Sequence, residues 1–177
     1  MEVRAFKKVR EVLGKTICAY FVANEYWHTA VWLRMTDRSV LMFKSSERHI
    51  APKFDVSEIE AVNTSIDPPA WIPVEPPLGV SRLRYLRRDE WLMRGAVGPT
   101  LGVDPHTQLV GPVGSANSSS VASATVLAGV LFESGAGGRI AVYTSPSAPL
   151  NIDIATDAHA VDDVLAMHTS SQRPNAG

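Results

Sequence analysis

The 177-residue sequence contains a single cysteine, Cys18. One thiol cannot form a disulfide within the chain, and a zinc site built from several cysteines is excluded as well. Cys18 lies inside the apolar run 16–22, where a thiol behaves as a small hydrophobic side chain rather than as a nucleophile. The cysteine content therefore predicts a fold held together by packing, in a reducing compartment.

An excess of charge and a long apolar run are also missing. Lysine and arginine number 17 against 18 aspartates and glutamates, for a net charge of −1, which disfavours a strongly basic nucleic-acid binder. No apolar segment approaches the ~20 residues that a membrane helix needs. The first eight residues mix both charge signs, unlike a signal peptide. We expect a soluble, cytoplasmic bacterial protein with no membrane contact.

The sequence shows no catalytic signature. It has no Gly-x-Ser-x-Gly motif, and its Gly-rich stretch 134–139 runs into the strand-like residues 140–143. A phosphate loop needs a helix there, so a hairpin turn is favoured. The densest group of metal-ligand types is Asp157, His159, Asp162 and Asp163, but carboxylates are also favoured at a helix start. The sequence disfavours an enzyme without excluding one, and it predicts no cofactor and no metal.

Two stretches share one pattern. Residues 30–44 and 130–144 each read as an apolar run, a polar or glycine-rich turn, and a second apolar run, which is typical of a β-hairpin. Each is followed by Ala-Pro and then by an apolar-Asp-apolar triplet, at 51–56 and 148–154. This is either an internal duplication or a recurrence of ordinary hairpin chemistry.

Helical patterns flank these hairpins. Apolar residues at helical spacing over 3–13 predict a short helix ending at Gly14, although a leading strand is an alternative because several of them are valines. Asp157 is expected to cap a helix over 158–167, with Val161, Val164 and Leu165 facing inward. We therefore predict an α+β fold, a mainly antiparallel sheet built on two hairpins, with a short helix near each end.

Composition divides the chain into four parts. We expect an N-terminal hairpin half (1–66), a connection (67–79), a C-terminal hairpin half sharing the same core (80–168) and a flexible tail (169–177). The connection holds five prolines, which exclude a helix or a central strand. It is either an extended linker between two domains or a loop packed by Trp71.

The most distinctive polar segment spans residues 82–94. It carries five arginines against Asp89 and Glu90, beside aromatic residues, which is the composition of a protein-binding surface. The alternatives are a solvated strand whose arginines pair with its own carboxylates, and a nucleic-acid site, which the net charge makes the weaker of the two. The predicted partner-binding residues are Arg84, Arg87, Arg88, Glu90 and Trp91.

Residues 87–92, together with 126–132 and 150–152, resemble uncharacterised bacterial proteins whose hairpin-rich style is similar to immunity proteins that neutralise toxins. The resemblance implies a small, non-enzymatic protein that binds a toxin or effector, and it transfers no functional residues. Two other hypotheses stay open. One is a small-ligand-binding or enzymatic domain with the Ser-rich loop 111–123 as a lid, and the other is a structural subunit that assembles through an unpaired strand edge.

Overall fold

The computed structural model describes residues 4–25, 28–51, 54–93, 121–145 and 148–170. These residues form two helices and nine strands. In chain order they are α1 (Arg4–Arg10), β1 (Thr16–Glu25), β2 (His28–Met35), β3 (Val40–Ala51), β4 (Phe54–Asn63), β5 (Ile72–Gly79), β6 (Arg82–Met93), β7 (Val121–Glu133), β8 (Arg139–Ser145), β9 (Ala148–Ala155) and α2 (Ala158–Ser170).

The strands form two meanders of four. Strands β1 to β4 pair antiparallel in chain order, as do β6 to β9, and β5 adds to the free side of β1. A short parallel contact between β2 and β9, at Thr29 and Asn151, joins the meanders into one nine-stranded sheet. The Thr29 hydroxyl strengthens this junction by donating to the Ile152 carbonyl at 2.7 Å.

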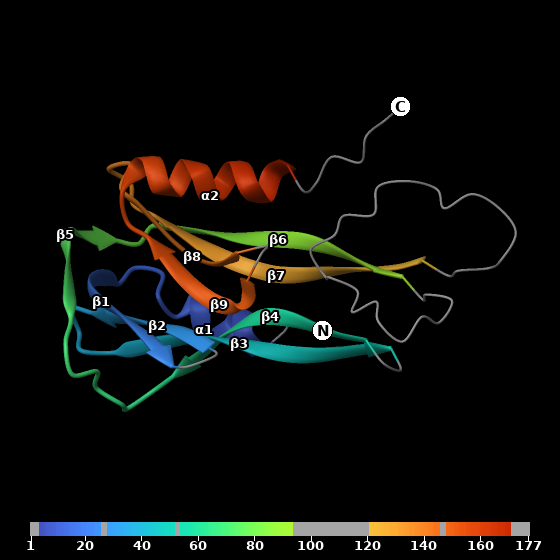
Figure 1. The fold of residues 1–177 in the computed structure, drawn as a ribbon. Coiled ribbons are helices and arrows are strands. Elements are labelled where there is room, and N and C mark those ends of the chain that lie inside the picture. Colours follow the sequence, from blue (N-terminus) through green and yellow to red (C-terminus); the bar gives the residue numbers. More distant parts are fainter. Residues whose placement is uncertain (1–3, 26–27, 52–53, 94–120, 146–147, 171–177) are drawn as a thin grey trace, which may run out of the picture.

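The sheet curls so that the two meanders face each other, with α2 on the outer side of the β6–β9 layer (Figure 1). The α+β class expected from the sequence describes this fold only loosely, because strands dominate it. The finer expectation, a mainly antiparallel sheet built on two hairpins, is not confirmed. The parallel β2–β9 junction makes the sheet mixed, and tertiary packing rather than local sequence decides which strands meet there.

The main core lies between the two layers. Alternate residues of each strand point to the same face of a sheet, so Val31 and Leu33 of β2 pack inward, as do Val130 and Phe132 of β7. Phe43 of β3 meets Phe132 edge-on, with ring centroids 6.1 Å apart. The core thus draws on residues from both hairpin segments.

A second apolar cluster lies under α2. Asp157 caps this helix, since its Oδ1 accepts the Ala160 N–H at 2.8 Å. Val161 and Val164 are buried against Leu86 and Leu131. The predicted cap and the predicted inward face of this helix are both confirmed.

The N-terminal helix is shorter than predicted. It ends at Arg10, and the following residues form turns in which the Glu11 N–H bonds the Lys8 carbonyl at 3.2 Å. Tightening to i→i−3 bonds is common at the end of a helix, and here it leaves Leu13 45% exposed. Gly14 has φ +80°, as expected of the residue that ends such a segment.

The proline-rich connection contributes a strand to the first layer. β5 pairs with β1, and its register is interrupted between Ile17 and Ala19 of β1. Just before it, the Trp71 indole donates to Asp67 at 2.9 Å and stacks under the Arg34 guanidinium at 4.7 Å. Within the described ranges, no helix is long and apolar enough to cross a membrane.

Candidate functional site

The predicted arginines lie on β6, at one end of the sheet order. Leu83 and Tyr85 pack toward the core between the layers, whereas Leu86 packs into the cluster under α2. Strand alternation therefore places Arg84 on the α2 side and Arg87 on the opposite side. The one irregularity in the β6–β7 ladder is an extra residue on β7, between Leu127 and Gly129, so the alternation along β6 is kept.

Two of the β6 arginines share one carboxylate. Glu133 of β7 lies opposite Arg82 in the ladder, and its oxygens lie 3.7 Å from Arg82 Nε and 3.2 Å from Arg84 Nε. The arginine side chains remain 72% and 45% exposed, against 19% for Glu133. Arg87 is also exposed. One carboxylate cannot neutralise two guanidinium groups, so the start of β6 presents net positive charge to solvent.

Arg88 is buried, at 5% exposure, which removes it from the predicted binding surface. Its Nη1 donates to the Thr144 hydroxyl at 3.3 Å, and that hydroxyl donates to the Ala128 carbonyl at 3.2 Å. His168, in the last turn of α2, is buried nearby against the Tyr143 ring. Burial and then the positive charge of Arg88 lower the pKa of His168 to about 4. The imidazole is therefore neutral at physiological pH, and Arg88 has a structural role.

The last two predicted residues, Glu90 and Trp91, continue β6 opposite Ala124 and Ser123. Their side chains lie outside the described part of the structure. The five predicted residues do not form one face, because Arg84 and Arg87 point to opposite sides and Arg88 is covered. The period of two along a strand was the signal in the sequence that separates them.

The described strands end in three sheet edges, and these differ in their protection. β5 carries Pro73, Pro76 and Pro77, which cannot donate to an added strand. β4 has α1 packed against it, with a bond from the Asn63 amide to Glu11 at 3.4 Å. β6 is a 12-residue strand without proline or glycine, and among the described strands it pairs with β7 alone.

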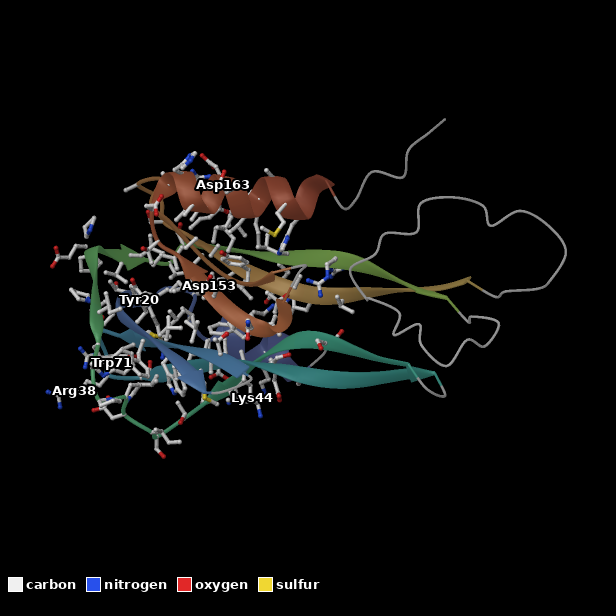
Figure 2. The ribbon with its side chains drawn as sticks, viewed as in Figure 1. Tyr20, Arg38, Lys44, Trp71, Asp153 and Asp163 are labelled. Atoms are coloured by element: carbon white, nitrogen blue, oxygen red, sulfur yellow. The ribbon has the colours of Figure 1, made fainter. Side chains whose placement is uncertain are left out.

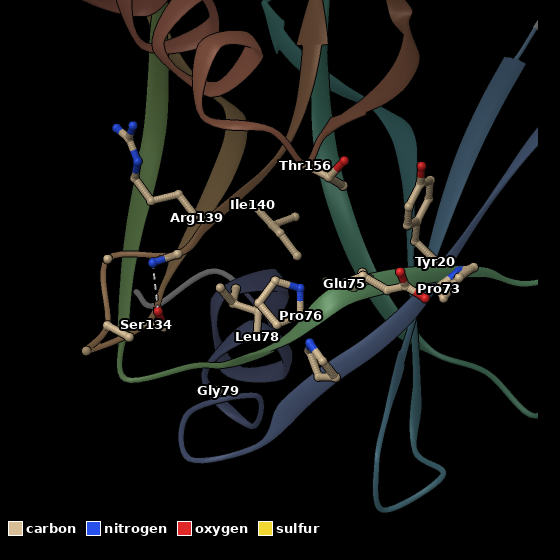
Figure 3. Close-up of a pocket in the computed structure, with 16 residues that line it drawn as sticks. Tyr20, Pro73, Glu75, Pro76, Leu78, Gly79, Ser134, Arg139, Ile140 and Thr156 are labelled. Carbon is tan, nitrogen blue, oxygen red and sulfur yellow. Dashed lines mark hydrogen bonds between the residues drawn. The ribbon is translucent and has the colours of Figure 1, made fainter.

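A pocket of about 830 Å³ lies at the end of the two layers where β5 meets the β7–β8 turn (Figure 3). The turn sits tightly against β5, since a Cβ on Gly138 would approach Leu78 Cδ1 to 2.8 Å. The walls carry the β5 prolines with Tyr20, Glu75 and Thr156. Figure 3 shows the Arg139 side chain extending away from Leu78, and its guanidinium bonds Asp162 of α2 at 2.8 Å.

The acidic residues around α2 have separate partners. Asp157 caps the helix, Asp162 holds Arg139, and Asp163 lies 3.7 Å from the exposed His159. In the portion of the chain that the structure describes, no three metal-ligand side chains come together.

Comparison with protein-family models, with curated proteins and with solved structures found no match. Functional inference for this chain consequently starts from the geometry of β6 and of the pocket.

Proposed function

We propose that this chain is a non-enzymatic protein-binding protein that docks its partner along β6. The observation that carries the proposal is one strand that pairs, among the described strands, with β7 alone and that also carries exposed positive charge. Arg82, Arg84 and Arg87 extend from this strand into solvent. Guanidinium groups make paired hydrogen bonds to carboxylates, and arginine is enriched at the residues that dominate binding energy.

Neutralisation of a toxin by direct binding is the specific form of this function that the sequence suggested. In that form the partner is a toxin or effector produced alongside this chain, and the cytoplasm is the place where they meet. The β6 surface has the chemistry for such a complex without any catalytic group, because docking requires only complementary charge and exposed hydrogen-bonding groups.

Reconstitution of a purified complex tests the proposal. The tagged chain is isolated from its native host, a stoichiometric partner is identified by mass spectrometry, and the two purified proteins are titrated by calorimetry. We expect Arg87→Glu to weaken the complex at least about ten-fold, since reversing a contacting charge replaces attraction by repulsion.

Lys44→Glu is the matched control. Lys44 is an exposed strand lysine on β3, in the layer opposite β6 (Figure 2), and it pairs with Glu60 at 3.6 Å. The substitution changes the net charge by the same amount as Arg87→Glu. Equal affinity loss in both variants, or no loss in either, would remove β6 from the interface.

A second candidate function, the binding of a small ligand, is favoured by the pocket beside β5. Its volume suits a metabolite-sized molecule, and its Tyr20 and Thr156 side chains offer hydroxyl groups. Residues 111–120 of the proposed lid 111–123 lie outside the described part of the structure.

A thermal-shift screen against metabolites and nucleotides tests this second function, because a ligand that binds only the folded state raises the melting temperature. A hit that is lost in Tyr20→Phe or Glu75→Gln would place the ligand in the pocket. A flat response across the screen would leave protein binding as the better account.

A further inference from the structure

The β6 edge indicates the chemistry of its occupant. We infer that the partner contributes an extended, acidic segment that adds to β6 as an antiparallel strand, with carboxylates at the first, fourth and sixth positions. This inference rests on the proposed function and specifies the partner segment. The surface that carries it is Arg82–Arg87, called the basic edge below.

The first step is the backbone. An edge strand presents unpaired N–H and C=O groups, and an extended segment can satisfy them by joining the sheet. The prolines of β5 oppose such addition at its edge. β4 carries Asp55, Glu58 and Glu60 instead of arginines, so its edge does not attract an acidic segment. The residues of the basic edge extend about 20 Å along the strand, enough for a segment of six residues.

The second step is charge. Natural sheet edges are commonly protected from unwanted pairing by charged side chains, and on the basic edge these charges are three arginines. Like charges placed opposite each other across two strands are destabilising, whereas opposite charges are stabilising. A second copy of this chain would bring arginines against arginines. An acidic segment is instead attracted, so the edge selects for acidic strands and against self-association.

The third step is register. In an antiparallel pair the added segment runs in the opposite direction to β6. Its first residue therefore lies opposite Arg87. The residue three positions later lies opposite Arg84, and the residue five positions later lies opposite Arg82. Strand alternation then puts the first carboxylate on the Arg87 face and the other two on the α2 face. The second, third and fifth positions lie opposite Leu86, Tyr85 and Leu83, where apolar side chains fit.

Two synthetic hexapeptides test the inference, each with three glutamates, three valines and blocked ends. The matched peptide has glutamate at the first, fourth and sixth positions. The swapped peptide has glutamate at the second, third and fifth positions, so each carboxylate faces an apolar residue. Both have equal charge and composition. We expect the full chain to bind the matched peptide at least about five-fold more tightly, as two or three favourable cross-strand pairs allow.

Two variants of the chain should change the affinity for the matched peptide in opposite directions. Arg87→Glu should weaken binding of the matched peptide at least about five-fold, while Lys44→Glu leaves it unchanged. Glu133→Gln should tighten binding about two-fold, because it removes the carboxylate that competes for Arg82 and Arg84. A variant that merely damages the fold cannot tighten binding. Hydrogen exchange should show new protection of β6 amides when the matched peptide is present.

The results separate this inference from the proposed function. Equal binding of the two peptides, or matched-peptide binding without protection of β6 amides, would overturn strand addition. Loss of the protein complex in Arg87→Glu together with no binding of either peptide would also overturn it, while leaving docking on β6 intact. A protein complex insensitive to Arg87→Glu would refute the proposed function itself.

Discussion

Acid should destabilise this protein through one buried histidine. His168 is 4% exposed in the last turn of α2, and its folded-state pKa of about 4 lies below the ordinary histidine value of 6.5. The main cause is burial, which disfavours the charged imidazolium, and the second is the cationic Arg88. Among the elements packed around it, β8 contributes the Tyr143 ring and β6 contributes Arg88.

The sign and size follow from proton linkage. The unfolded chain binds a proton at His168 near pH 6.5, whereas the folded chain resists it until about pH 4, so stability is complete above the unfolded value and falls as the pH drops between the two. From about pH 7 to about pH 5, this single group should cost roughly 2 kcal/mol of unfolding free energy. Hydrogen bonds from Ser39 and Lys15 lower the pKa of Asp37 to about 2. The contribution of Asp37 to stability is therefore lost only at a pH below this range.

Urea denaturation followed by circular dichroism, at the two pH values and constant ionic strength, measures the difference. His168→Phe should remove most of the pH dependence, because an apolar ring in the same site takes up no proton. His159→Phe, on the exposed side of the same helix, should retain it. If His168→Phe and the wild-type chain lose equal stability between the two pH values, the buried-histidine reasoning is wrong.

Substitutions at three further positions have defined outcomes. Gly129→Ala should lower the unfolding free energy by about 3 kcal/mol or prevent folding, because the new Cβ would lie 2.7 Å from the Val142 carbonyl oxygen. Gly135→Ala, where nothing lies within 4 Å, should change it by less than about 0.5 kcal/mol in the same chemical denaturation. Asp157→Ala should cost about 1 kcal/mol by removing the α2 cap, and Asp157→Asn should recover most of it; an unchanged Asp157→Ala midpoint would contradict the capping role.

The sequence predicted the structure correctly where the interacting residues lie a few positions apart in the chain. The Asp157 cap and the inward valines of α2 depend on spacing within one helix, so a helical period predicts them. The end of α1 was predicted less accurately, because no residue before Gly14 signals the change from helix to tight turns after Arg10.

The candidate site shows the limit of this reasoning. Composition alone grouped Arg84, Arg87 and Arg88 as one surface, although alternation already assigns the first two to opposite faces. The burial of Arg88 depends on α2 and Thr144, which lie more than fifty residues away in sequence. A residue of this kind cannot be classed as surface or core before the elements that cover it are placed.

The sequence by itself determined the helix over α2, the two turns at 36–39 and 134–139 and the exclusion of disulfides, because each depends on residues a few positions apart or on composition. Only the tertiary structure decided that β2 and β9 meet in parallel, that the proline-bearing β5 adds to β1, and that β6 lies at the end of the sheet order with exposed arginines. Pairing between distant strands is set by how the two layers bury their apolar faces together. That global packing is not encoded in any short stretch of the chain.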